Sequence, residues 1–318
     1  MSMASTPRTT PRTPPVTVRA SAKVNLALGV GPRAEDGFHP LATVFEAVGL
    51  HDTITAGPRD DDVIAVTVEG PEADLVPTDE SNLAYRAAEL LRSRCADPHL
   101  GVDLHITKSI PVAGGMAGGS ADAAGALLAC SVLWDIDAGP GDLHDLAAEL
   151  GSDVPFALIG GVALGRGRGD RLVPVIFRGT HHWVFATSEE GLSTPAVYRR
   201  FDELGGGGGD LVPTALIAAL TRGDIDAVAG GLGNDLQEAA LDLRPELAGV
   251  LEAGVEAGAM AGLVSGSGPT VAFLVGGEAI GRTVAKTLRT LPQVSSVRGA
   301  RGPAQGAQLM AGTLEAGS

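Results

Sequence analysis

A glycine-rich segment between a predicted strand and a predicted helix constrains this chain more than any other stretch. Residues 111–125 read PVAGGMAGGSADAAG and follow GVDLHITKS (101–109), which is typical of a strand. An alanine-rich helix is predicted from Ser120, a residue type that caps helices. A strand, a glycine turn and a helix in this order present unpaired backbone N–H groups and a positive dipole end, so we expect an anion such as phosphate there. The alternative is a connection of small residues that serves close packing.

The segment matches neither of two common glycine-rich nucleotide-binding patterns. The Walker pattern requires a Lys-Ser or Lys-Thr pair after its last glycine, and here Gly119 is followed by Ser120 and Ala121. The dinucleotide pattern G-x-G-x-x-G is broken at Ala113. A phosphate bound here would therefore take its positive side chains from other parts of the chain.

Lysines are rare, which draws attention to two of them. The chain has three lysines, and the other 20 of its 23 basic residues are arginine. Lys23 interrupts an apolar predicted strand in SAKVNL, and Lys108 lies three residues before Pro111. A strand lysine can simply point to solvent, but lysine also offers a compact, movable charge that arginine does not. Both interpretations stay open at this point.

Two further segments combine polar and apolar side chains. Asp153 in GSDVPFALIGG either caps a helix or forms a partly buried carboxylate that accepts a proton or pairs with a lysine. EDGFHP (35–40) lies between two predicted strands. It is either a hairpin turn or a recognition loop in which Phe38 stacks on a ligand and His39 forms a hydrogen bond.

The order of the predicted elements indicates an α+β protein. Strands are followed by helices in the first half, and helices and short strands make up the second half. Thr194 is expected to cap a helix with Pro195 at its first position, and SGSGP (265–269) is expected to be a turn between two strands. We predict strands at 16–30, 42–50, 52–58, 63–70, 101–109, 181–187 and 294–300 and on both sides of 265–269, and helices at 82–95, 120–134, 142–150, 194–204, 213–221, 234–241, 245–256 and 278–291.

Composition restricts the partners and the location. The net charge of −15 argues against general nucleic-acid binding, which depends on basic surface. Cys95 and Cys130 are widely spaced and lack partner histidines nearby, so neither a disulfide nor a zinc site is expected, and the cytoplasm is the expected location. Residues 1–15 lack the apolar core of a signal peptide and are predicted to be a disordered tail. No membrane span is expected, because SGSGP interrupts the long uncharged stretch 257–277.

Five separated motifs resemble the GHMP kinase superfamily. PVAGGMAGGS resembles its phosphate-binding motif P-x-x-G-G-x-x-G-G-S, and VSGSGPTVAFLV resembles its C-terminal glycine-rich motif. AKVNLAL, EDGFHP and GSDVPF, in this order around the glycine loop, resemble the branch that acts on a diphosphocytidyl substrate. The resemblance extends from about residue 16 to about residue 300.

The resemblance implies a two-domain GHMP kinase fold of the α+β class. After the tail at 1–15, residues 16–170 would form an ATP-binding domain like domain 2 of ribosomal protein S5. Residues 171–318 would form a ferredoxin-like C-terminal domain.

The resemblance also implies a reaction and its partners. ATP, with Mg²⁺ bridging its phosphate oxygens, would phosphorylate the 2-hydroxyl group of a cytidine diphosphate sugar alcohol in the non-mevalonate isoprenoid pathway. The alternatives are a kinase of the homoserine or mevalonate type and a non-catalytic ATP-binding sensor. Neither nucleic acid nor a membrane is an expected partner, and a weak homodimer is left open.

The residues of this chain that stand at the family's motif positions are the implied site residues. Lys23 and Asp153 match the family's catalytic pair. The residues implied to hold the substrate are Asn25, Phe38, His39 and Tyr198, with Phe38 and Tyr198 on either side of the cytosine. The residues implied to bind ATP are Asn82 and Lys108 near the adenosine and, at the phosphates, Pro111, Val112, Ala113, Gly114, Gly115, Met116, Ala117, Gly118, Gly119, Ser120 and Ala121.

Three positions depart from the family pattern. Phe38 stands where the family usually has tyrosine, so stacking is kept and a hydroxyl hydrogen bond is lost. Ala113 replaces a glycine and Ala121 replaces a serine, which removes a hydroxyl from the loop.

Ser120 is the candidate to contact Mg²⁺, and Asp122 is a weaker one, because an acidic residue in the first turn commonly interacts with the helix dipole alone.

Overall fold

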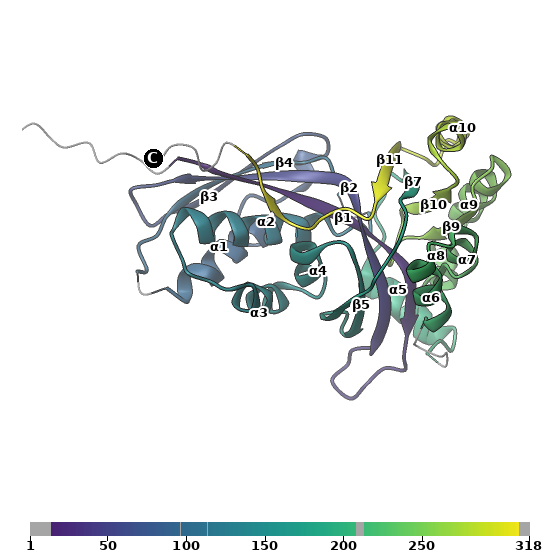
Figure 1. Ribbon diagram of the computed structural model, residues 1–318, viewed down its shortest axis with the longest axis horizontal. Helices are drawn as coiled ribbons and strands as arrows, with labels where there is room; N and C mark the ends of the chain where they lie inside the picture. The colour runs from purple at the N-terminus through teal and green to yellow at the C-terminus, as the bar shows by residue number, and fades with distance from the viewer. Residues whose placement is uncertain (1–13, 96, 113, 208–212, 312–318) are drawn as a thin grey trace, which may run out of the picture.

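The computed structural model describes residues 14–95, 97–112, 114–207 and 213–311. These residues form two β-sheets with helices packed against each sheet, which confirms the predicted α+β class. Figure 1 shows the first sheet with its helices on the left and the second sheet with its helices on the right. The long strands β1 and β2 connect the two regions (Figure 1).

The first sheet is built around β1 (Val16–Val30) and β2 (Leu41–Pro58). They pair antiparallel, and residues 31–40 join them as the predicted hairpin connection. The two strands predicted at 42–50 and 52–58 are one continuous strand. Residues 20–28 of β1 are buried without interruption, because this strand is covered on both faces.

The remaining strands of the first sheet are shorter. β12, β1, β2, β4 and β3 follow one another across the sheet, while β5 pairs with β2 and β6, and β8 pairs with β1. The sequence did not predict β5, β6, β8 or β12. Their bounds, with those of β3 and β4, are β3 (Ile64–Glu69), β4 (Val102–Thr107), β5 (Val162–Gly167), β6 (Arg171–Pro174), β8 (Gly233–Asn234) and β12 (Gln308–Leu309).

Small side chains bring helix α2 (Gly118–Leu133) directly onto the first sheet. It packs against β1, β2 and α1 (Leu83–Ser93). A Cβ atom at Gly125 would lie 2.5 Å from the Ile54 side chain, so a larger residue would push the helix away. Two further helices, α3 (Pro140–Leu150) and α4 (Val154–Ile159), also pack against α2, while a 3₁₀ helix, η1 (Ala73–Leu75), contacts β3.

The second sheet has the order β11-β7-β10-β9, and all its pairs are antiparallel. Along the chain, β7 is followed by helices, β9, β10, α10 and β11, which is the predicted ferredoxin-like arrangement. SGSGP forms the predicted turn between β9 and β10. In the described parts of the chain no helix is both long and apolar enough to cross a membrane. The bounds are β7 (His181–Thr187), β9 (Ala261–Val264), β10 (Val271–Val275), β11 (Ser296–Gly302), α5 (Thr194–Glu203), α6 (Thr214–Arg222), α7 (Ile225–Gly230), α8 (Gln237–Leu243), α9 (Glu246–Glu256) and α10 (Glu278–Leu288).

A buried carboxylate joins the two sheets. Glu46 on β2 accepts hydrogen bonds from His181 Nδ1 at 2.6 Å and from Trp183 Nε1 at 3.0 Å, both on β7. The predicted domain boundary between residues 170 and 171 stays a prediction, and it falls between the paired strands β5 and β6.

Two predicted helix caps are wrong. α2 begins at Gly118, and Ala117 precedes it in the left-handed region with φ of 61°, so Ser120 lies inside the first turn. Glycine suits the first position of this earlier start, because a Cβ atom at Gly118 would lie 3.2 Å from Lys108 Nζ and 3.3 Å from Ile110 Cγ2. α5 begins at Thr194, which makes Thr194 the first helical residue and Pro195 the second.

Candidate active site

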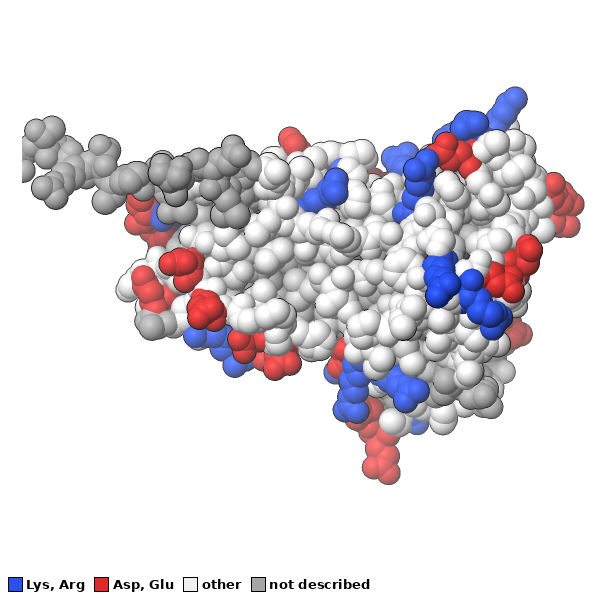
Figure 2. Space-filling model, in the orientation of Figure 1, with Lys and Arg blue, Asp and Glu red and all other residues white. Residues whose placement is uncertain are grey.

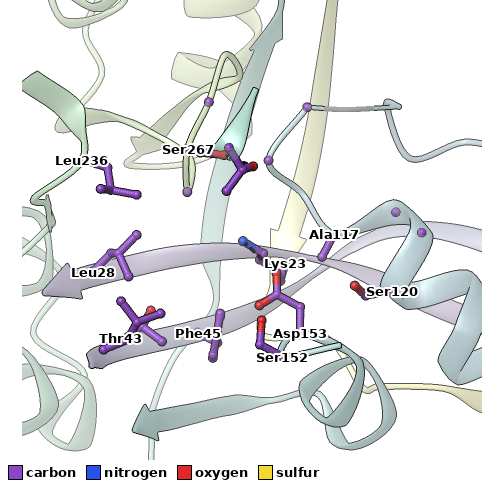
Figure 3. A pocket seen from close by; sticks show the side chains of 18 of the residues that line it. Lys23, Leu28, Thr43, Phe45, Ala117, Ser120, Ser152, Asp153, Leu236 and Ser267 are labelled. Carbon is purple, nitrogen blue, oxygen red and sulfur yellow. Dashed lines mark hydrogen bonds and ion pairs between the residues drawn. The ribbon is translucent and has the colours of Figure 1, made fainter. Parts of the chain in front are cut away.

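A cavity of 410 Å³ opens where the two sheets meet (Figure 3). Its walls come from β1, β2, the glycine loop, the start of α4, α5 and the turn between β9 and β10. Figure 3 shows the side chains of Lys23 and Asp153 directed toward one another within it. Segments that are far apart in the sequence therefore share one site.

Lys23 is buried on β1, and its neighbours hold its ammonium group in place. Nζ donates to Oδ1 of Asn25, which lies on the same face of the strand, at 2.7 Å. Asn25 Nδ2 donates to the Thr43 hydroxyl at 2.8 Å, and this hydroxyl donates to the Ala27 carbonyl at 2.8 Å. Nζ also lies 5.7 Å from the centroid of the Phe45 ring. Because Lys23 is 6% exposed, the interpretation that it points to solvent is wrong.

Asp153 stands immediately before α4 without capping it. Among the described residues its side chain makes no hydrogen bond to the first turn of that helix. Its Oδ2 lies 3.5 Å from Lys23 Nζ, and 30% of the side chain is exposed. A carboxylate that can accept a proton thus lies beside a positive charge and remains open to the cavity.

The start of α2 is open to the same cavity. No side chain of the described residues caps this helix, so the N–H groups of its first turn have no side-chain partner there. Gly118, Gly119 and Ser120 line the cavity. The backbone therefore offers donors and a positive dipole end next to Lys23 and Asp153.

Hydrogen bonds from β1 and from the turn between β9 and β10 also hold the glycine loop in place. The backbone N–H of Lys23 donates to the Met116 carbonyl at 3.2 Å, and the Ser265 hydroxyl donates to the Gly115 carbonyl at 3.2 Å. Gly115 has φ of 73°, and a Cβ atom there would lie 2.2 Å from the Ser265 carbonyl oxygen. Close packing thus explains this glycine, whereas the open helix start explains why an anion could bind.

The second glycine turn closes the cavity from the other sheet. A Cβ atom at Gly266 would lie 3.4 Å from Lys23 Nζ. The Gly266 carbonyl accepts a hydrogen bond from Asn234 Nδ2 at 2.7 Å, and the hydroxyls of Ser267 and Thr194 lie 2.8 Å apart. The turn is therefore held by β8 and by the start of α5.

A second cavity of 500 Å³ adjoins the first. Phe38 and Tyr198 line it, and Phe38 is 49% exposed. The guanidinium carbon of Arg168 lies 3.9 Å from the centroid of the Phe38 ring, which is a cation–π contact. This cavity offers aromatic faces and positive charge to a ligand. The residues that line both cavities are Leu41, Ser152, Arg168, Thr194 and Tyr198.

His39 is held by the protein at both of its ring nitrogens. Nδ1 lies 2.9 Å from the Gly31 carbonyl oxygen, and Nε2 lies 3.3 Å from Asp202 Oδ1. Its ring centroid is 5.3 Å from that of Tyr198. Burial, with the charge of Asp153, raises the pKa of Tyr198 to about 12, so the phenol is neutral. The predicted contact of His39 with a substrate stays a prediction, and a ring nitrogen would have to give up a protein partner to make it.

Lys108 is buried beneath the glycine loop between two carboxylates. Its Nζ donates to Asp52 at 2.5 Å and to Asp122 at 2.7 Å, and Asp52 also accepts the backbone N–H groups of Ser109 and Ile110. Burial alone would lower the pKa of Lys108, but the charges of Asp122 and Asp52 raise it. Burial raises the pKa of Asp122. The cluster fixes the chain at the entrance to the loop.

A third cavity, of 290 Å³, lies beside the start of α2 and contains the two residues implied to contact adenosine. Asn82 and Lys108 line it, together with Gly118 and Gly119. Asn82 is the predicted cap of α1: its Oδ1 accepts from the backbone of Ala84 at 2.8 Å. The other residues that line it are Leu75, Val76, Pro77, Ser81, Leu83, Pro111, Val112 and Asp122.

Comparison with known proteins identifies the family. Residues 82–161 match the model of the GHMP kinases N terminal domain, and residues 216–290 match that of GHMP kinases C terminal. A 4-diphosphocytidyl-2-C-methyl-D-erythritol kinase of Cutibacterium acnes is 65% identical over 94% of this chain and 98% of its own length. The chain belongs to the 4-diphosphocytidyl-2-C-methyl-D-erythritol kinase family. A relative of the same name from Streptomyces avermitilis is 54% identical over 93% of this chain and 99% of its own.

Solved structures of GHMP kinases share the fold. The crystal structure of a 4-(cytidine 5'-diphospho)-2C-methyl-D-erythritol kinase superposes with a TM-score of 0.74 at 34% identity, over 90% of this chain and 98% of that one. A homoserine kinase from Cytophaga hutchinsonii superposes with a TM-score of 0.76 at 18% identity, over 96% and 100%, which shows the common fold alone. The predicted two-domain GHMP kinase fold is therefore confirmed.

The loop residues of this GHMP kinase differ in their access to the cavities. Ala113 lies outside the described residues, and the side chains of Met116 and Ala121 are fully buried. Gly114, Gly115 and the residues from Ala117 to Ser120 line the first cavity, while Pro111 and Val112 line the third.

Sequence reasoning missed several residues of this kinase site. Thr43 and Phe45 alternate along β2 and share a face beside Lys23, so the period of the strand could have indicated them. Arg168 lies in the glycine-rich GRGRGD that joins β5 to β6, and no sequence signal relates it to Phe38. The role of Asp52 as a partner of Lys108 was likewise not foreseen.

Proposed function

We propose that this chain transfers the γ-phosphoryl group of ATP to the 2-hydroxyl group of 4-diphosphocytidyl-2-C-methyl-D-erythritol. The substrate is the one named for its relatives. One observation supports the roles of the residues: Lys23 and Asp153 face each other in a cavity that adjoins both the open start of α2 and the Phe38–Tyr198 cavity. A phosphoryl donor and an acceptor alcohol bound on these two sides would meet at this pair.

Asp153 is proposed as the general base and Lys23 as the charge stabiliser. As the acceptor oxygen bonds to the γ-phosphorus and the bond from that phosphorus to the β-phosphate oxygen breaks to release ADP, the acceptor hydroxyl passes its proton to the Asp153 carboxylate, which is exposed to the cavity. Lys23 offsets the negative charge of the transferring phosphoryl group. Because Asn25 already accepts from this ammonium group and Thr43 holds Asn25 in place, the group needs little reorganisation during the reaction.

The first turn of α2 is proposed to bind the phosphates of ATP. Its N–H groups and dipole face the cavity, which supports this role. The described residues contain no group of three or more His, Cys, Asp or Glu side chains that could hold a metal ion, which fits a Mg²⁺ ion held mainly by phosphate oxygens. Ser120 would contribute its hydroxyl, whereas Asp122 accepts from Lys108 through Oδ2 and buries its Oδ1 without a hydrogen-bond partner among the described residues. Bound Mg²⁺ would neutralise charge on the β- and γ-phosphates.

The other two cavities are proposed to hold the two nucleoside parts. The adenosine would occupy the 290 Å³ cavity, where Lys108, already paired with Asp52 and Asp122, forms a wall. The cytosine would lie against Phe38 and Tyr198, a stack worth about 1–3 kcal/mol per base. Arg168 lines both cavities that the acceptor would occupy, so its guanidinium would meet the substrate's diphosphate.

We also propose where the reaction takes place. It would serve the non-mevalonate route to isoprenoid precursors, in the cytoplasm, on small molecules without nucleic acid or a membrane. Every residue assigned above comes from one chain, so a weak homodimer would add nothing that the proposed mechanism needs.

A coupled ADP-release assay tests the proposed function. We expect ATP turnover with 4-diphosphocytidyl-2-C-methyl-D-erythritol and none with homoserine, with mevalonate or without an acceptor. Turnover with homoserine or mevalonate instead would assign a different kinase specificity. ATP binding without turnover on any acceptor would indicate a sensor.

Gly118→Val tests the phosphate role of the loop. A Cβ atom at Gly118 would lie 3.2 Å from Lys108 Nζ and 3.3 Å from Ile110 Cγ2, so a branched side chain would displace the first turn of α2. We expect ADP affinity, measured by calorimetry, to fall about tenfold for each charge-assisted hydrogen bond lost. Gly141→Val in the first turn of α3, where a Cβ atom has no neighbour within 4 Å, is the matched control. An unchanged affinity in a folded Gly118→Val protein would rule out this role.

A further inference from the structure

A cavity of 710 Å³ lies between α10 and the strands β7 and β11. None of the described residues that line it also lines one of the three cavities assigned above. Its volume falls within the range of about 300–1,000 Å³ that is typical of small-molecule sites. The proposed kinase reaction makes no use of it.

The floor of this cavity is uncharged and built from small residues. Gly281 and Ala285 of α10, Val184 of β7 and Gly299 of β11 line it. At Gly299 a Cβ atom would have the Trp183 carbonyl oxygen, at 3.9 Å, as its nearest neighbour. The sheet surface at this edge strand is therefore bare, and an uncharged ligand body could lie on it.

Arginine side chains dominate the rim. Arg282, Arg289 and Arg301 line the cavity. Among the described residues that line it, Glu278 is the acidic one. This local excess of positive charge contrasts with the net charge of −15 of the whole chain. Figure 2 shows basic side chains gathered over α10 and β11, with an acidic one between them.

Glu278 orients part of this rim. It accepts a hydrogen bond from Arg301 and lies 3.9 Å from Arg282, while Arg289 donates to the Val297 carbonyl at 3.5 Å. The hydrogen bond from Arg301, with the charges of Arg301, His182 and Arg282, lowers the pKa of Glu278, so this carboxylate stays ionised at neutral pH. Three guanidinium groups against one carboxylate leave positive charge to be neutralised by a ligand.

We propose that this cavity binds a small organic phosphate. Its phosphate group would lie beside Arg282 and Arg301, which both reach Glu278 at the start of α10, and its uncharged body would lie along the floor between α10 and β11 toward Arg289. A guanidinium group pairs with two oxygens at once, so a single arginine can satisfy a carboxylate. Several arginines around one cavity suit a phosphate, which has more oxygens to share and up to two negative charges.

Calorimetric titration of the full-length chain with 1-naphthyl phosphate tests this site. No nucleotide is added, because ADP and CDP are themselves small organic phosphates that could enter this cavity, and the variants below separate binding here from binding in the cavities assigned to the reaction. We expect one mole of 1-naphthyl phosphate to bind per mole of chain, and 1-naphthol and inorganic phosphate each to bind more weakly. Absence of binding under these conditions would overturn the proposal. Equal binding of 1-naphthol would show that the phosphate group adds nothing to the affinity, which would overturn the proposed contact of the phosphate with arginine.

Two variants locate the binding. Arg282→Ala removes one guanidinium group, and we expect about a tenfold weaker affinity for 1-naphthyl phosphate. Gly299→Leu fills the floor without changing charge and should abolish binding. Arg222→Ala on α6, whose side chain is 61% exposed, is the matched control and should bind as the unaltered chain does. Kinase turnover should be unchanged in all three, and undiminished binding in a folded Arg282→Ala or Gly299→Leu protein would overturn the proposal.

Discussion

Asp153→Asn should lower kcat by about 10²- to 10⁴-fold, the usual contribution of a general base. Asparagine keeps the size of the side chain beside Lys23 but cannot accept the proton of the acceptor hydroxyl. Lys23 keeps its hydrogen bond to Asn25, and the start of α2 is untouched, so ADP should bind as before. Steady-state turnover and calorimetry with ADP separate these two effects.

Asp145→Asn on α3 is the matched control for Asp153→Asn. Its side chain is 90% exposed, and the same change of charge there should leave turnover unaltered. If Asp153→Asn turned over at a rate close to that of the unaltered chain, the assignment of the base would be wrong. If ADP affinity and turnover both fell, the substitution would have damaged the whole site.

Lys108→Met should lower the free energy of unfolding by about 3–5 kcal/mol, the typical cost of breaking a buried ion pair from one side. Methionine fills much of the space, but Asp52 and Asp122, 0% and 3% exposed, lose their positive partner. Burial already raises the pKa of Asp122, and in the folded variant it should rise further because the Lys108 charge no longer lowers it. The protonated Asp122 is then tolerated at low pH, and stability is lost as pH rises through its raised pKa. Urea unfolding at pH 5 and pH 8 should show the larger deficit at pH 8.

Lys286→Met provides the control for Lys108→Met. Lys286 is exposed on α10, and such a surface change usually alters stability by no more than about 0.5 kcal/mol. Equal urea midpoints for the two variants would mean that the buried cluster contributes no net stability. A deficit in Lys108→Met that did not depend on pH would mean that lost packing, rather than charge, causes it.

Much of the fold could be predicted because local sequence patterns determine these elements. The apolar run at 16–30 predicted β1, and the alanine-rich stretch after the glycine loop predicted α2, since each period matches one kind of element. Lys23 and Asp153, 130 positions apart in the numbering, could be paired because separate motifs carried both, and the structure places them 3.5 Å apart.

Contacts that depend on tertiary packing could not be predicted. The strands β8 and β12 have two residues each, too few for any periodicity, and they form because β1 offers them a partner. The buried bonds of Glu46 to His181 and of Lys108 to Asp52 join residues whose neighbouring sequence contains no sign of each other. Ser120 was predicted as a cap because local preference favours serine there, whereas the glycine loop starts the helix earlier.

The pairing of β12 with β1 has a consequence for how the protein forms during translation. Val18 lies opposite Leu309 and Arg19 opposite Gln308, so the strand that carries Lys23 receives a partner from near the other end of the chain. A ribosome makes β1 early and β12 late, with the whole second sheet in between. Sheet pairings over so long a sequence separation form slowly. The edge of β1 at Val18 and Arg19 therefore stays unpaired on this side until most of the chain has been synthesised.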